Sequence, residues 1–258
     1  MSVSPGTVSK ILWHFTGGPR WNLSANKQEE VPKPDNEAYQ GFLGILSSRE
    51  LRVGAYKEVV KVRVPVVRKL NRETRKLETL RDTIQELQSA PVCCLADIPI
   101  AHLPYHAKRY GRFAIGFRRK AAIGAGFNPV LYTLHDTDVA RAFYEGLVSL
   151  KGLDNWLLKE YLSNIETAVD AAECEKGHQV ALDVLNEIGG AESEADDLGD
   201  GIDIASENIR SLLAFVKTFE EGEFSTIYCE REWRSVSPLK FEAEDIAMLV
   251  LPKKMEDG

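Results

Sequence analysis

Two blocks of strand-like sequence enclose a long region with helical periodicity, and this order limits the folds open to the chain. Before the helical region, short apolar and β-prone runs occur at PVCCLADIPI (91–100), FAIGF (113–117) and PVLYTL (129–134). After it, strand-like runs return at FSTIYCEREWRSV (224–236) and EDIAMLVLP (244–252). The simplest assembly is a sheet that the chain leaves and later rejoins.

We therefore predict an α+β fold with a mixed or antiparallel sheet and a helical insertion. Residues 1–136 and 221–258 are expected to form the core domain. Residues 137–220 carry apolar side chains at helical spacing and are predicted to be the insertion. Its acidic tract ESEADDLGDGID (192–203) is predicted as a flexible loop.

The N-terminal third is predicted to alternate strands and helices. ILWHFT (11–16) is typical of a strand that ends at GGPR, and YQGFLGILSSREL (39–51) of a short helix and a turn. EVVKVRVPVV (58–67) alternates like a strand. In residues 68–88, leucine and isoleucine recur at spacings of three, four and seven, which predicts a charged amphipathic helix; they are Leu70, Leu77, Leu80, Ile84 and Leu87.

Charge is unevenly distributed along the chain, whose formal net charge is −7. This total argues against a simple nucleic-acid coat protein, because phosphate binding needs a basic surface. Residues 49–82 hold eleven Lys or Arg against five acids, and the simplest interpretation of this segment is a solvated surface. Residues 174–224 hold three Lys or Arg against thirteen acids. Residues 101–120 contain six cations and no acid, so an anionic ligand such as a pyrophosphate or a nucleic-acid backbone would suit them.

The cysteines and the hydropathy indicate a cytoplasmic protein without a membrane segment. The four cysteines show no CxxC spacing, so neither a zinc site nor a disulfide framework is expected, and no metal is predicted. Cys93 and Cys94 lie in an apolar run that is typical of inert buried thiols. No apolar stretch reaches the ~18 residues that cross a bilayer, and no signal peptide is evident.

The stretch EREWRSV (230–236) is the first candidate site. Alternate side chains of a strand share a face, so Glu230, Glu232 and Arg234 are expected on one face. If that face lines a cleft, the two carboxylates differ in pKa and can divide the work of base and charge stabiliser. The alternative is a charged edge strand whose glutamates pair with neighbouring arginines.

Two further motifs could bind a ligand. His14 to Gly18 combine an imidazole, the hydroxyl of Thr16 and a glycine turn at a strand end, where small ligands often dock. Alternatively, His14 is a hydrogen-bonded core residue. Residues 105–111 (YHAKRYG) offer an aromatic and cationic rim that could stack a flat ring and hold phosphates, or they form an ordinary surface turn.

These segments, taken in order, resemble a known family. WHFT, ILSSRELRV, VCCLADIPI with HLPYHAKRYGRFAIGF, PVLY and EREWRSV resemble the AbiGi-type abortive-phage-resistance proteins. More distantly the chain is similar to bacterial families with an ADP-ribosyltransferase-like fold, including the DarT DNA-modifying toxins. The resemblance covers residues 11–134 and 224–251, and residues 137–220 match neither.

The distant similarity implies that NAD+ is a substrate. Glu232 would stabilise the cationic sugar formed when nicotinamide leaves, and Glu230 would orient or deprotonate the acceptor. The similarity also implies that His14 and Thr16 anchor the ribose or the nicotinamide. Tyr105 or Tyr110, beside His106, would stack on the nicotinamide ring. Arg109 or Arg112 would bind the pyrophosphate.

Two classes of function stay open. The first is an NAD-dependent ADP-ribosyltransferase that acts as a toxin or effector in anti-phage defence and modifies nucleic acid or protein. This class includes an NAD+ glycohydrolase, in which water replaces the acceptor. The joint presence of His14, Glu230 and Glu232 favours it. The second is a non-catalytic antitoxin or regulatory partner of an abortive-infection toxin. The acidic residues 174–224 favour it, because they offer an electrostatic docking surface.

Overall fold

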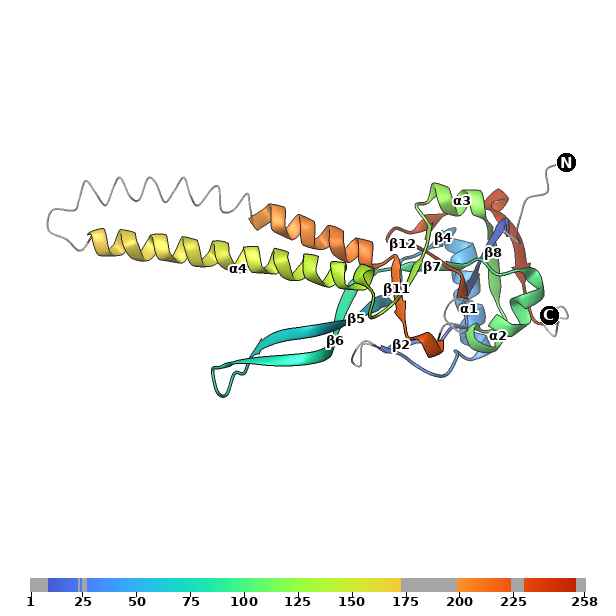
Figure 1. Cartoon of the computed structure of the whole chain (residues 1–258). Helices are drawn as coiled ribbons and strands as arrows, with labels where there is room; N and C mark the ends of the chain where they lie inside the picture. Colours follow the sequence, from blue (N-terminus) through green and yellow to red (C-terminus); the bar gives the residue numbers. More distant parts are fainter. Residues whose placement is uncertain (1–8, 23, 25–26, 173–198, 224–229, 254–258) are drawn as a thin grey trace, which may run out of the picture.

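A six-stranded antiparallel sheet lies in the compact part of the protein, at one end of the molecule (Figure 1). The computed structural model describes residues 9–22, 24, 27–172, 199–223 and 230–253. The strand order across the sheet is β14 (Ile246–Val250), β8 (Ala114–Arg118), β1 (Ile11–Phe15), β7 (Cys93–Ala96), β12 (Glu232–Ser235) and β9 (Asn128–Pro129). The predicted α+β class and the antiparallel sheet are confirmed.

Both faces of this sheet are buried, which explains its apolar strands. On β1, Leu12 and Trp13 are fully buried on opposite faces and belong to different clusters of the core. The Leu12 cluster includes residues of α1 (Asp35–Ser48) and α3 (Arg119–Gly124), whereas the Trp13 cluster includes Leu103 of α2 (Leu103–Tyr110). A one-residue slip of β1 would exchange these faces, so the register is strongly specified.

Short elements complete the core. β2 (Trp21–Asn22) pairs with β3 (Lys27–Gln28), and β4 (Glu50–Leu51) pairs with β13 (Leu239–Lys240). The second pair joins the two predicted parts of the core domain. In the described part of the chain, the 3₁₀ helices are η1 (Ile100–His102), η2 (Glu221–Glu223) and η4 (Ala243–Asp245).

Residues 68–88 do not form the predicted helix. They belong to a long antiparallel hairpin of β5 (Lys57–Leu70) and β6 (Leu77–Pro91), which extends away from the core in Figure 1. Asn71 starts the turn, because its Oδ1 accepts hydrogen bonds from the backbone amides of Glu73 and Thr74. The leucine spacing fits a helix as well as a strand, but the valine stripe of β5 needs a partner strand.

The helical region lies beside the base of this hairpin. α4 (Asp138–Ala172) and the helical residues 199–213 both contribute to a cluster with Val60, Val62 and Val64 of β5; the helical members include Ala140, Leu147 and Leu213. Of the acidic tract predicted as a loop, residues 199–203 are helical, and residues 192–198 lie outside the described part of the chain. The boundaries 137 and 220 stay a prediction.

The helical prediction for residues 207–219 is wrong at its end. The helix ends at residue 213, and β11 (Val216–Phe219) follows and pairs in parallel with β10 (Leu131–Leu134). Val216 and Phe219 are buried. Pairing with β10, which is far away in the sequence, therefore decides the conformation of residues 216–219. This pairing returns the chain to the strand that precedes the helical region.

Candidate functional site

A small cavity of about 120 Å³ lies where β1, β7 and α2 meet, next to the start of β12. Five of the residues predicted to be catalytic or ligand-binding line it, namely His14, His106, Tyr110, Glu230 and Glu232. A close backbone contact between Gly17 and Gly111 brings the end of β1 next to the end of α2. A Cβ atom on Gly17 would lie 2.8 Å from Gly111 Cα, and Gly111 has a φ of +84°, so neither position accepts a side chain without movement.

The two histidines are uncharged groups of the cavity wall, where His106 is buried and His14 is half-buried. His14 Nδ1 lies 3.1 Å from the carbonyl oxygen of Cys94, and burial lowers the pKa of His14. Burial also lowers the pKa of His106, whose ring stacks on Tyr110 with centroids 6.3 Å apart. Lowered pKa values keep both imidazoles neutral at pH 7, so each can donate or accept one hydrogen bond.

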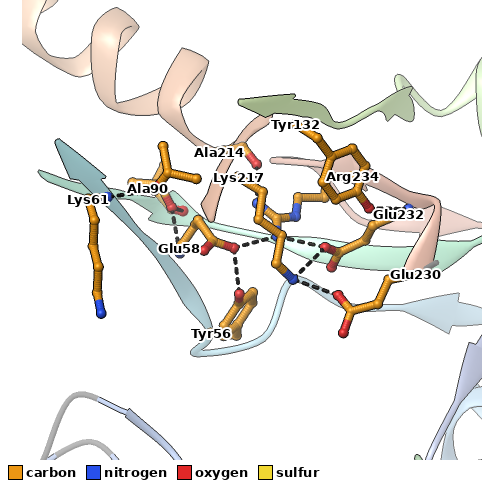
Figure 2. A network of polar contacts seen from close by, with 12 residues as sticks. Tyr56, Glu58, Lys61, Ala90, Tyr132, Ala214, Lys217, Glu230, Glu232 and Arg234 are labelled. Atoms are coloured by element: carbon orange, nitrogen blue, oxygen red, sulfur yellow. Dashed lines mark hydrogen bonds and ion pairs between the residues drawn. The ribbon is translucent and has the colours of Figure 1, made fainter. Parts of the chain in front are cut away.

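Glu230 and Glu232 belong to a chain of ionic contacts at the edge of this cavity (Figure 2). Lys217 Nζ lies 2.6 Å from Glu230 Oε2 and 3.4 Å from Glu232 Oε2, so one ammonium group bridges the two carboxylates. Glu230 also accepts hydrogen bonds from Tyr110 at 2.8 Å and from Arg109 at 3.1 Å.

The chain continues from Glu232 into the interior. Arg234, which is fully buried, donates to Glu232 at 2.7 Å and also contacts Glu58. Glu58 in turn accepts a hydrogen bond of 2.6 Å from the hydroxyl of Tyr56. The ionic network therefore contains three cations and three anions, which are Arg109, Lys217 and Arg234 with Glu58, Glu230 and Glu232.

The pKa shifts follow from this pairing. Burial disfavours the charged form of Glu232, but Arg234 and Lys217 outweigh it and lower its pKa to about 2. Burial likewise opposes the charge on Lys217, and Glu232 and Glu230 outweigh it, so the pKa of Lys217 lies well above its usual value. Glu232 is thus ionised at neutral pH, and its charge is matched by two neighbouring cations.

Four other residues that were predicted to bind a cofactor do not line the cavity. Thr16 donates to the carbonyl oxygen of Ala38 at 2.7 Å and ties the end of β1 to α1. Tyr105 is 63% exposed, with its ring edge against His106. Arg112 pairs with Asp35 at the surface. Arg109 lies outside the cavity wall, paired with Glu230 and with its guanidinium carbon 5.3 Å from the centroid of the Tyr110 ring.

The predicted geometry of EREWRSV is partly wrong. β12 lies between β7 and β9, so it is not an edge strand, and it begins at Glu232. Glu230 precedes the strand, and Arg231 has a φ of +42°, which breaks the strict alternation that the sequence suggested. Lys217 nevertheless bridges the two glutamates. Residues 224–229, which were also predicted as strand, lie outside the described part of the chain, as does Cys229.

Cys93 and Cys94 fit the prediction of inert thiols. Both are free, and burial raises the pKa of Cys93 to about 12 and that of Cys94 well above its usual value. Cys174 falls in a range that the structure leaves undescribed. Among the described residues, no cluster of His, Cys, Asp and Glu is suited to hold a metal ion.

Lys217 and Glu58 belong to the site but were not predicted from the sequence. Glu58 carries a usable signal, because strand alternation places it on the same face as Val60 and Val62, which is the buried face. A carboxylate on a buried face requires a partner. Lys217 carries no such signal, since its role depends on pairing between β10 and β11.

The fold and the site define an α+β protein with a charge-balanced ionic network beside a small cavity. Residues 57–254, most of the chain, match the family model described as "Putative abortive phage resistance protein AbiGi, antitoxin". The chain belongs to this AbiGi family, as predicted from its sequence motifs. The extent of the resemblance was predicted wrongly, because the match includes residues 137–220 and does not include WHFT or ILSSRELRV. No curated protein and no solved structure matches it. Within the described residues, no helix is both long enough and apolar enough to cross a membrane.

Proposed function

We propose that this protein is an antitoxin that acts by binding the toxin of an abortive-infection system, without chemistry of its own. The family description supports this proposal directly. The observation in the structure that carries it is the pairing of Glu232 with both Lys217 and Arg234.

This pairing bears on catalysis because a glycosyl cation is stabilised by a carboxylate whose charge is available to it. The charge of Glu232 is already matched by two cations of the ionic network, and that of Glu230 by Lys217 and Arg109. The cavity of about 120 Å³ is also smaller than the roughly 300–1,000 Å³ that is typical of ligand sites. The ionic network therefore fits a structural role that fixes β12 against β11 and β5.

Co-expression tests the antitoxin function. The chain and the toxin of the same defence system are placed under separate inducers, and growth is followed. We expect the chain alone to be harmless, to restore growth to toxin-expressing cells and to co-purify with the toxin. Growth arrest by the chain alone, relieved by Glu232→Gln, would contradict the proposal.

The second candidate is an NAD-dependent ADP-ribosyltransferase with an ADP-ribosyltransferase-like fold. The observation in its favour is that His14, His106, Tyr110, Glu230 and Glu232 line one cavity. In this function NAD+ would be the substrate, Glu232 would face the ribose, and the acceptor would be nucleic acid or protein. The cavity would have to widen, and a ligand would have to displace Lys217 from Glu232.

Labelled NAD+ separates the two candidates. The purified protein and its Glu232→Gln variant are incubated with labelled NAD+ and cell extract, and label transfer and nicotinamide release are measured. The antitoxin function predicts neither product from either protein. Label transfer by the wild type that is lost in Glu232→Gln would establish the second candidate.

A further inference from the structure

The distal part of the β5–β6 hairpin is a two-stranded ribbon without cover from the core. We define this arm as residues 66–81, which are the last five residues of β5, the turn and the first five residues of β6. The base of the hairpin is buried against α4, with Val60, Val62 and Val64 inside. In the arm, by contrast, Val66, Leu70 and Leu77 are 54%, 57% and 69% exposed.

The arm is strongly cationic on a protein whose net charge is −7. It holds six cations and two acids, and all six cations are exposed; they are Arg68, Lys69, Arg72, Arg75, Lys76 and Arg81. Among the residues that the structure describes, no salt bridge joins any of these six to a carboxylate. Their charge is thus available to a partner.

The cations surround the arm and do not gather on one face. Arg68 and Lys69 are successive residues of one strand and therefore point to opposite faces. Arg72, Arg75 and Lys76 lie in the turn at the tip. A flat protein surface would reach one face only. A groove bordered by negative charge on both sides reaches all of them.

The major groove of B-form DNA has this geometry. It is about 12 Å wide and admits a two-stranded β-ribbon, whose strands lie about 4.8 Å apart. Phosphates line both of its edges. We propose that the arm inserts into the major groove of duplex DNA, where its cations contact the two phosphate backbones and Leu70 and Leu77, paired at the tip, meet the base edges.

The acidic remainder of the protein does not prevent this contact. The five residue pairs from Val66 to Leu70 extend the arm by about 14 Å at about 3.4 Å per residue. This length exceeds the screening length of about 8 Å at physiological salt. The tip therefore presents its own charge to a partner and not the net charge of the chain.

Fluorescence anisotropy with labelled duplex DNA tests the proposal on the full chain. The test variant is Arg72→Gln/Arg75→Gln/Lys76→Gln. The matched control is Lys10→Gln/Lys240→Gln/Lys253→Gln, which removes three exposed cations that lie outside both the arm and residues 101–120. We expect the wild type and the control to bind with the same salt dependence. In the test variant, the slope of log affinity against log salt should fall by about 3, since each lost phosphate contact removes about 0.9.

Four results would overturn the proposal. The first is equal weakening of DNA binding in the control and the test variant, and the second is no binding by the wild type at about 50 mM salt. The third is displacement of the duplex by polyglutamate at equal charge concentration. The fourth is a wild-type protein that is a dimer and a test variant that is a monomer. The third result would assign the arm to an acidic protein, and the fourth to a second copy of the chain. Duplex RNA should bind more weakly than DNA, because its major groove is deep and narrow. Equal unfolding midpoints of all three proteins show that the substitutions leave the fold intact.

Discussion

At the scale of single residues, Lys217 determines whether two buried carboxylates can coexist. It lies 2.6 Å from Glu230 and 3.4 Å from Glu232, and its own side chain is only 15% exposed. Desolvating three charges costs free energy, and this cost is offset only while each charge has a partner. The ionic network is therefore sensitive to the loss of any member.

Lys217→Met should therefore destabilise the protein strongly. We expect a loss of about 3–5 kcal/mol in the free energy of unfolding, because two carboxylates lose a shared cation in a buried site. Lys61→Met is the matched control, since Lys61 is exposed and its side chain points away from the ionic network (Figure 2). It should change stability by less than about 0.5 kcal/mol. Urea denaturation measures both, and equal values would show that the bridge adds no stability.

The lowered pKa of Glu232 predicts a specific acid sensitivity. Its pKa falls from 4.5 to about 2 on folding, so the native state binds fewer protons than the unfolded state between these values. The associated stability is complete above pH 4.5 and is lost as pH falls toward about 2.

Glu232→Gln removes this titration. In that window we expect the stability of the variant to fall less steeply than that of the wild type, by up to about 1.4 kcal/mol per pH unit. Urea denaturation at a series of pH values from 6 downward checks the slope. Parallel slopes would mean that Glu232 titrates alike in the folded and unfolded states.

The candidate site shows which residues a sequence can predict. His14, His106, Tyr110 and Glu230 stand in motifs whose local chemistry is visible, and the structure places them around one cavity. Glu58 was detectable from strand alternation, since it shares the buried face of β5. Lys217 was not, because only the parallel pairing of β10 with β11 brings it to the glutamates.

At the scale of elements, the hairpin shows the same limit. Leucines at spacings of three, four and seven favour a helix over residues 68–88, yet every one of these residues except the turn lies in a strand. The local signal for a turn was Asn71, whose side chain accepts two backbone hydrogen bonds. Helical periodicity without a capping residue is weaker evidence than an Asn-containing turn between two β-prone runs.

Shortening the arm should leave the fold intact. Arg68 and Thr79 are cross-strand partners, so residues 69–78 can be replaced by Asn-Gly, a sequence that favours two-residue hairpin turns. Residues 69–78 make no contribution to the described core clusters, and we expect the unfolding free energy to change by less than about 0.5 kcal/mol. By contrast, Val62→Ala at the buried base should cost about 2 kcal/mol. A strongly destabilised short-arm variant would show that the arm packs on the core.

At the scale of the whole molecule, opposite charges are separated between different segments of the sequence. The arm is basic, whereas residues 153–199 contain twelve acids and two bases. The net charge of −7 is therefore a property of one region of the sequence. Removing residues 153–199 would change the formal net charge from −7 to +3.

A variant in which a short Gly/Ser loop replaces residues 153–199 tests whether the acidic region affects DNA binding by the arm. α4 and the helical residues 199–213 lie side by side near Lys151 and Ile202, so a short loop can join them (Figure 1). The core contacts of Leu147 and Leu213 remain, and the variant should fold. If the arm binds DNA, the variant should bind more tightly than the wild type at low salt, because long-range repulsion is removed. The difference should shrink at high salt, where screening acts on both. Fluorescence anisotropy across a salt series measures the difference in DNA affinity between the variant and the wild type. Equal affinities of the two proteins at low salt would show that the acidic region exerts no electrostatic field at the arm.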